Sequence, residues 1–356
     1  MNILDDLEKI KSLDPENMLG IEENFYGQLS KAKDIGENTD ISKIRKKDFA
    51  GLAFLGMGGS GFAGDIIKSL VKFDISIPVE TVKGYKLPAY INKNWLVIAV
   101  SYSGGTEETV ATASEALNRG CEVIFSTSGG KMEKIAIEND KCIVSVPKGY
   151  QPRAASGYLF LPLYILLGRI GLISLDMDKI NHAISEIKAK AGLYNRNVAS
   201  EKNPAKKIAI EIGSNLPVIY GFEGLMAPVA FRWKCQINEN SKCPAFYNEF
   251  PELNHNETVG WERLKETTKD FVLIVFKDKD QSNVMKTRIA TTTRLIRGNF
   301  NKIIEIEAEG ISDFEKALNM MYLGGISSVY LALLNNTNPT PVSKIDALKA
   351  ELAKEV

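Results

Sequence analysis

The chain has little of what metal sites and membrane spans require. Its 356 residues include two histidines, His182 and His255, and four cysteines with no CxxC spacing. No HExxH pairing occurs, so we expect no zinc site, no metal and no cofactor, and metal-free acid–base chemistry for any catalysis. No run reaches the ~18 apolar residues of a bilayer span, and the N-terminal stretch has no signal-type apolar core. We therefore expect a cytoplasmic protein without a membrane partner.

Net charge is absent too. The 44 Lys and Arg residues balance 44 Asp and Glu residues, so no global field would attract nucleic acid, and an anion must be held by local geometry. What is present is typical of a globular protein, with 44% hydrophobic and 25% charged residues. The length is enough for one large or two medium domains.

Short apolar runs alternate with helical patterns in two stretches of the chain. This alternation predicts an α/β fold with two lobes, each a mainly parallel, doubly wound, flavodoxin-like sheet flanked by helices. The expected strands are Leu52–Leu55, Ile75–Val82, Trp95–Val100, Glu122–Phe125, Ile143–Val146, Leu216–Tyr220, Phe271–Phe276 and Ile303–Glu307. The expected divisions are N-terminal helices at 1–34, a first lobe at 35–172, a helical connector at 173–207, a second lobe at 208–336, and a tail with a C-terminal helix at 337–356.

A glycine cluster follows the first apolar run. In GLAFLGMGGSGFAGD, at 51–65, a strand should lead through a glycine turn into a helix N-terminus, whose N–H groups and positive dipole end suit a phosphate. Gly56, Gly58 and Gly61 also match the GxGxxG spacing of dinucleotide-binding enzymes, and Glu80 lies near the distance required for their acidic residue. This turn alone leaves a nicotinamide enzyme and a purely structural turn open.

A second turn, SYSGGTEET at 101–109, follows a later strand. Ser101, Ser103 and Thr106 would bring three hydroxyls to a helix N-terminus, and Gly104–Gly105 would permit close backbone approach. Helix capping explains Thr106 but not the rest of the turn. A dinucleotide enzyme has no use for this second cradle, and no GxxxxGK[ST] P-loop occurs. The two turns together predict a small phosphorylated ligand.

Other polar groups suggest the chemistry. Arg153, in QPRAASGYLF, follows the last strand of the first lobe without an acidic neighbour, so we expect it to meet an anion or oxyanion. In the second lobe, FRWKCQINENSKCPAFYNEFPELNHNETVGW is dense in polar groups beside aromatics. Spacing alone does not favour Glu239 or His255 as the reacting groups. The other glutamates of this stretch, Glu249, Glu252 and Glu257, are equally placed by spacing.

These segments resemble a known family. GMGGS, SYSGGTEET, STSGG, PRAASGYLF, NENSK, PELNHNETVGW and the C-terminal PTPV..ID.LK, in this order, are similar to the bifunctional phosphoglucose/phosphomannose isomerases, which have the SIS (sugar isomerase) fold of the phosphoglucose isomerase superfamily. NENSK with ELNHNE is more specific than either glycine turn. The resemblance implies two SIS-type lobes plus a C-terminal helix. It also implies a homodimeric enzyme of carbohydrate metabolism that interconverts glucose 6-phosphate and mannose 6-phosphate with fructose 6-phosphate.

Carried over position by position, the resemblance assigns roles. Glu239 matches the base that moves the proton between C1 and C2, and Arg153 matches the arginine beside the enediolate. His255 matches the histidine that helps to open the sugar ring, which in this superfamily comes from the partner subunit. The positions that match the 6-phosphate site are Gly58, Gly59, Ser60, Ser101, Ser103 and Thr106.

The C-terminal segment carries two further assignments by resemblance. The VExxK pattern of the superfamily aligns best with Ile345–Lys349, which makes Lys349 the expected site lysine and Lys344 its competitor. Thr340, or less favourably Thr337, would supply the hydroxyl that in the bifunctional enzymes accompanies acceptance of mannose 6-phosphate.

Two alternatives remain beside the isomerase. One is a NAD(P)-dependent oxidoreductase that uses the first glycine turn. The other is a non-catalytic SIS regulatory protein that binds a sugar phosphate.

Overall fold

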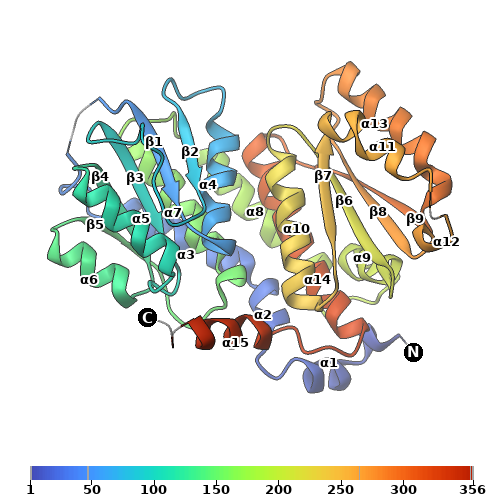
Figure 1. Ribbon diagram of the computed structural model, residues 1–356. Helices are drawn as coiled ribbons and strands as arrows, with labels where there is room; N and C mark the ends of the chain where they lie inside the picture. The colour runs from blue at the N-terminus through green and yellow to red at the C-terminus, as the bar shows by residue number, and fades with distance from the viewer. Residues whose placement is uncertain (1, 46–47, 264, 353, 355–356) are drawn as a thin grey trace.

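The computed structural model describes residues 2–45, 48–263, 265–352 and 354. Two parallel sheets form two lobes that lie side by side, with helices between them and on their outer faces (Figure 1). The N-terminal helices run beneath and behind both lobes, and they are η1 (Ile3–Asp5), α1 (Leu7–Leu13), α2 (Met18–Glu23) and α3 (Phe25–Asn38).

The first lobe holds a five-stranded sheet in the order β2-β1-β3-β4-β5, and all neighbouring strands are parallel. Its strands are β1 (Gly51–Leu55), β2 (Val79–Val82), β3 (Trp95–Val100), β4 (Glu122–Thr127) and β5 (Cys142–Ser145). Its helices are α4 (Gly58–Val71), α5 (Glu107–Asn118), α6 (Gly130–Glu138), the short η2 (Pro152–Ala154) and α7 (Ser156–Arg169).

The second lobe holds a four-stranded parallel sheet in the order β7-β6-β8-β9. Its strands are β6 (Leu216–Phe222), β7 (Phe246–Phe250), β8 (Phe271–Lys277) and β9 (Lys302–Glu307). The helices that lead into it, surround it and follow it are α8 (Met177–Tyr194), α9 (Pro204–Ile212), α10 (Met226–Ser241), η3 (Glu252–His255), α11 (Glu257–Gly260), α12 (Lys265–Thr268), α13 (Asn283–Ile296), η4 (Arg297–Asn299), α14 (Asp313–Leu334) and α15 (Ser343–Leu352).

The α/β prediction with two mainly parallel sheets and a C-terminal helix is confirmed, and most expected strands agree with the structure to within two residues at each end. Two strands depart further from the sequence expectation. β2 begins at Val79 rather than Ile75, because the Ile75 N–H still donates to the Val71 carbonyl at the end of α4, and Pro78 has no N–H to donate. β7 has no apolar pattern in the sequence, since it is an edge strand that pairs with β6 and leaves Phe246 51% exposed.

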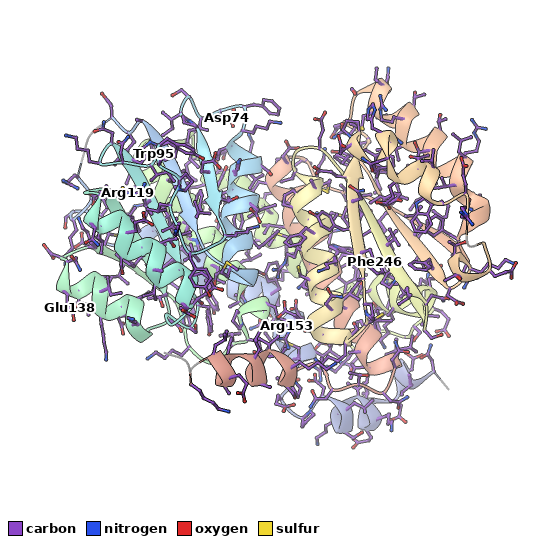
Figure 2. The ribbon with its side chains drawn as sticks, in the orientation of Figure 1. Asp74, Trp95, Arg119, Glu138, Arg153 and Phe246 are labelled. Atoms are coloured by element: carbon purple, nitrogen blue, oxygen red, sulfur yellow. The ribbon has the colours of Figure 1, made fainter. Side chains whose placement is uncertain are left out.

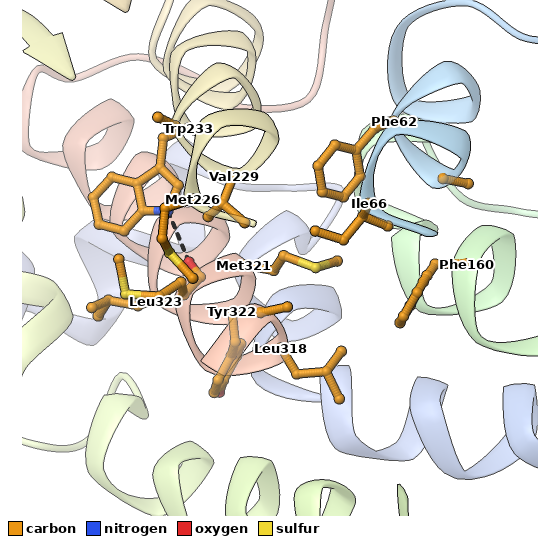
Figure 3. Close-up of a cluster of buried hydrophobic side chains, with 14 of the residues drawn as sticks. Phe62, Ile66, Phe160, Met226, Val229, Trp233, Leu318, Met321, Tyr322 and Leu323 are labelled. Atoms are coloured by element: carbon orange, nitrogen blue, oxygen red, sulfur yellow. Dashed lines mark hydrogen bonds between the residues drawn. The ribbon is translucent and has the colours of Figure 1, made fainter. Parts of the chain in front are cut away.

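One continuous core joins the two lobes. In the close-up of Figure 3, Phe62 of α4 approaches Met226 and Val229 of α10, with Met321 of α14 below them. Trp233 donates its indole N–H to the Met320 carbonyl at 2.8 Å. Each large apolar side chain buried here contributes about 1.5–3 kcal/mol. The lobes are therefore held at a fixed spacing, on which any site between them depends.

Helix α14 is buried within this core. Of the described residues, it is the helix long and apolar enough to cross a membrane by length and composition alone. In its most apolar 18-residue window, 89% of the residues are buried inside the protein. Such burial is what the core helix of a globular protein shows, so the length of α14 is weak evidence for a membrane span.

Candidate active site

The first glycine turn begins helix α4 at the carboxyl edge of the first sheet. Gly58 has φ +53°, and a Cβ at this position would meet nothing within 4 Å. A Cβ on Gly59 would lie 2.9 Å from the Pro152 carbonyl oxygen, so this glycine permits contact with the η2 turn that carries Arg153. The first N–H groups of a helix lack intrahelical partners, which leaves donors beside Arg153 for an anion.

The second turn packs directly on the first. The Tyr102 N–H donates to the Ser60 hydroxyl at 3.1 Å, which links the two turns. Ser101 is fully buried, with its Oγ 2.8 Å from the Thr106 Oγ1. Ser103 is exposed at the mouth of the turn, and its Oγ accepts the Gly105 N–H at 3.4 Å. The structure thus brings all six residues proposed for phosphate binding to one edge of the sheet.

Arg153 joins this edge to the second lobe, as its labelled position between the lobes in Figure 2 indicates. Its side chain is 2% exposed, and its Nε donates to the Asn240 Oδ1 at 2.6 Å. Its Nη2 donates to the Pro339 and Thr340 carbonyl oxygens at 2.9 and 2.7 Å. These bonds use Nε and Nη2 and leave Nη1 without a hydrogen bond to any described residue.

Glu239 lies beside that nitrogen. Its Oε2 is 3.6 Å from the Arg153 Nη1, and its side chain is 29% exposed. It lines a pocket of about 450 Å³ between the end of α10 and the start of α15, together with Asn238, Lys242, Val342, Lys344 and Ile345. The Glu239 carboxylate therefore lines the pocket, with the buried Arg153 guanidinium next to it. A base beside a fixed positive charge is what a proton transfer with a developing oxyanion requires.

The tail before α15 closes this part of the site. The Thr340 Oγ1 is buried and has no hydrogen-bond partner among the described residues, although its carbonyl holds Arg153. The Thr337 hydroxyl instead donates to the Asn335 carbonyl at 3.2 Å. Of the two candidate lysines, Lys344 lines the Glu239 pocket, whereas Lys349 is exposed farther along α15, a helix whose C-terminal end lies below the first lobe (Figure 1).

His255 is not brought to this pocket within one chain. It ends η3, beyond the carboxyl end of β7, and it is exposed. Strands β6 and β7 are parallel, so their carboxyl ends lie at the same edge of the sheet. Helix α10 begins at this edge, and Glu239 lies in its last turn, at the far end of the helix. At 1.5 Å per helical residue the two side chains are on the order of 20 Å apart.

Similarity to known proteins extends over nearly the whole chain. Residues 201–352 match the family described as the bacterial phospho-glucose isomerase C-terminal SIS domain. Over 331 residues, covering 93% of this chain and 97% of the relative, the sequence is 38% identical to a bifunctional phosphoglucose/phosphomannose isomerase of Caldicellulosiruptor bescii. A protein of the same name from Aquifex aeolicus is 36% identical over 95% of this chain and 99% of the relative.

This chain belongs to the bifunctional phosphoglucose/phosphomannose isomerase family. Its fold agrees, since the crystal structure of a glucose-6-phosphate isomerase-like protein from Thermus thermophilus superposes with a TM-score of 0.63 at 17% identity. That superposition covers 97% of this chain and 100% of the other. The two lobes are thus of the SIS type that the sequence motifs predicted.

Behind Arg153, this family member buries a second set of charges that sequence reasoning missed. Arg232 is 4% exposed and donates from Nη2 to the Arg153 carbonyl at 2.8 Å. Glu22 is 6% exposed, and its Oε1 has no hydrogen-bond partner in the described part of the chain. Burial raises the pKa of Glu22 to about 7, against the opposing effect of the nearby Arg232 and Arg153 charges. No sequence motif marks Glu22, because it lies in an ordinary helical pattern far from Arg153.

The NENSK motif contributes more than the predicted base. Asn240 orients the Arg153 guanidinium, and Lys242 donates to the carbonyl oxygens of Glu239 and Pro339 at 2.6 and 2.9 Å. Burial, and next the charge of Arg153, lower the pKa of Lys242 to about 8. Lys242 therefore ties the end of α10 to the tail at the mouth of the pocket. The motif itself was the signal that could have identified both residues.

The buried Glu22 predicts a specific pH dependence of stability. Because its folded pKa lies above the ordinary value of 4.5, the folded state binds the extra proton. Proton binding by Glu22 therefore stabilises the folded state. This contribution is complete below about pH 4.5 and is lost as pH rises toward 7. Between pH 5 and 8 the free energy of unfolding of the wild type should fall, relative to that of Glu22→Gln, by up to ~3 kcal/mol.

Urea unfolding at pH 5 and at pH 8 measures this difference in the free energy of unfolding. The control is Glu37→Gln, a change at an exposed position of α3. Parallel pH dependences in wild type and E22Q would contradict it.

The turn at 101–109 offers a matched pair of glycine variants. Gly104 has φ +68°, and a Cβ there would lie only 1.7 Å from the Gly129 carbonyl oxygen. A Cβ on Gly105 would meet nothing within 4 Å. Gly104→Ala should therefore lower the free energy of unfolding by more than ~1 kcal/mol, and Gly105→Ala should change it little. Thermal unfolding of both variants measures the difference. Equal unfolding midpoints would show that stability does not depend on the close contact between Gly104 and Gly129.

Proposed function

We propose that this chain is an aldose–ketose isomerase that interconverts glucose 6-phosphate, and also mannose 6-phosphate, with fructose 6-phosphate. The reaction is a metal-free proton transfer through a cis-enediol or enediolate. The observation that carries the proposal is the pairing of Glu239 with the Arg153 Nη1 at 3.6 Å. The η2 turn that carries Arg153 also contacts Gly59, one of the residues proposed to bind the phosphate.

Each group has a chemical role in this proposal. The C–H proton beside the sugar carbonyl is a weak acid, so the enediolate must be stabilised as it forms. Glu239 takes the proton from one carbon and returns it to its neighbour. Arg153 places Nη1 toward the enediolate oxygens, since its other nitrogens are held by Asn240 and by the carbonyls of the tail. An arginine remains protonated throughout and so supplies charge without giving up its proton.

The 6-phosphate serves as a handle remote from the reacting carbons. Its binding to the N–H groups of Gly58 and Gly59 and to the hydroxyls of the second turn would hold the open chain against Glu239. Glucose and mannose 6-phosphates differ at C2, which is planar in the enediolate. The buried Thr340 Oγ1, without a partner among the described residues, is the group we assign to sugar hydroxyls near that carbon.

The site is completed by a second copy of the chain. The position of His255 at the opposite edge of the second lobe from Glu239 supports a homodimer in which each His255 assists ring opening in the partner's site. A cytoplasmic location is part of the same proposal. On α15, Lys349 is proposed as the second group that moves protons at the sugar oxygens, with Lys344, which lines the pocket, as its competitor.

A coupled assay tests the proposal. Purified protein is given fructose 6-phosphate in the presence of a chelator, and glucose 6-phosphate and mannose 6-phosphate are measured separately. Formation of both products supports the bifunctional isomerase. A shift in NADPH fluorescence on binding, without isomerisation, would favour an oxidoreductase. Fructose 6-phosphate binding without turnover would favour a regulatory SIS protein.

A further inference from the structure

The loop that carries His255 is fixed by a carboxylate two residues beyond it. The hydroxyl of Tyr220, on β6, donates to the Glu257 Oε1 at 2.5 Å. The amide of Asn248, on β7, donates to the Glu257 Oε2 at 2.5 Å. Both oxygens of this carboxylate, at the first residue of α11, are thus bound by side chains of two neighbouring strands.

The donors are themselves held in place. Tyr220 is fully buried, and its hydroxyl accepts the Trp261 indole N–H at 2.8 Å, so its own proton is directed to Glu257. Burial raises the pKa of Tyr220 above its ordinary value, with the neighbouring Glu257 charge as the next cause, which keeps the hydroxyl protonated as a donor. Trp261 is fixed in turn by the Phe300 ring, whose centroid is 4.4 Å away.

The other side of His255 is anchored as well. The Asn254 Nδ2 donates to the Thr292 Oγ1 of α13 at 2.7 Å, and Leu253 is fully buried. His255 itself is exposed, and none of the residues that the structure describes forms a hydrogen bond with its ring. A backbone anchored on both sides therefore presents an imidazole to which no described residue of its own chain is hydrogen-bonded.

We propose that Glu257, with Tyr220 and Asn248, is a positioning residue for His255. The inference rests on the proposed function, in which His255 acts in the partner's site. A histidine that serves another subunit must be oriented from its own loop, because the catalytic pocket it enters belongs to a different chain. Groups that act at a distance need such support to remain within a fraction of an ångström of the productive geometry.

The chemistry of the network specifies the variant. In Glu257→Gln one carboxylate oxygen becomes an NH₂ group. Facing Asn248, it would meet another NH₂ group. Facing Tyr220, it would displace the O–H bond from this side chain, because the hydroxyl oxygen, which already accepts the Trp261 N–H, would then accept the amide as well. Asn248 cannot simply turn over, because its Oδ1 accepts the Glu249 N–H at 2.8 Å. At least one of the two present bonds to this side chain is therefore lost or reversed, and its negative charge is removed, while its size stays the same.

A double-mutant cycle with His255→Ala tests the proposal. E257Q in the wild-type background should lower kcat for fructose 6-phosphate about 10-fold, with KM and dimer mass little changed, because misplacement of a reacting group costs rate rather than binding. In the H255A background E257Q should have no further effect on kcat, since the group it positions is gone. Tyr220→Phe should reproduce both results. Glu252→Gln, on the same loop, is the matched control, since its carboxylate takes one hydrogen bond, from the Asn256 amide.

The outcomes separate the inference from the function it rests on. An E257Q variant with unchanged kcat, or one that lowers kcat equally in both backgrounds, overturns the positioning role and leaves His255 in place. If H255A itself keeps full activity, the histidine has no catalytic part and the inference falls with that part of the proposed function. Should E257Q fail to fold, Y220F in the same cycle decides the question by the same criteria.

Discussion

Glutamine in place of Glu239 is expected to lower kcat for both isomerisations by about 10²- to 10⁴-fold, the range for loss of a general base. An amide of the same size cannot accept the sugar C–H proton. Arg153 keeps its bonds to Asn240, Pro339 and Thr340, so the fold and the proposed phosphate site should be retained. Steady-state kinetics with fructose 6-phosphate measures the loss, and calorimetry with a non-reacting hexose 6-phosphate analogue measures the binding that should remain.

The control for this variant is Glu211→Gln, a carboxylate on α9 that pairs with Lys302 at 3.1 Å. It should leave both kcat and analogue binding unchanged. Turnover by E239Q near the wild-type rate would remove Glu239 as the base and direct attention to the other carboxylates of the second lobe. Loss of analogue binding in E239Q would mean instead that the carboxylate organises the site before any chemistry.

A mixture of two inactive variants should regain activity if His255 serves the partner's site. Glu239→Gln and His255→Ala homodimers each lack one group in both sites. A hybrid dimer has one site with both defects and one with neither. Random exchange makes about half of the dimers hybrids, so the mixture should recover about a quarter of the wild-type activity per subunit. The assay follows fructose 6-phosphate turnover after exchange in mild denaturant and dilution.

The control is each variant taken through the same exchange alone, which should stay inactive. If the mixture shows only the sum of the two separate activities, His255 and Glu239 act within one chain, or His255 does not act at all. The distance on the order of 20 Å along α10 argues against action within one chain.

Local pattern was sufficient for much of the fold. Apolar runs with intervening helical spacing predicted both parallel sheets, because strands buried on both faces must be continuously apolar. The same logic failed for β7, since an edge strand with exposed Phe246 and Tyr247 needs no such run. The start of β2 was displaced because a proline and the unwinding end of α4 fall within the expected strand.

For the site, the sequence by itself determined which chemical groups are available: two glycine turns with hydroxyls, one arginine, and a motif with a carboxylate, along with family membership. Only the tertiary structure decided which groups meet. Arg153 donates its hydrogen bonds to residues 87, 186 and 187 positions away, and contacts of that separation leave no local pattern. The same reason explains why the sequence did not predict two further groups of contacts. One is Glu22 and Arg232 next to Arg153, and the other is Tyr220 and Asn248 on Glu257. Each pair is created by the packing of helices and strands, and not by spacing along the chain.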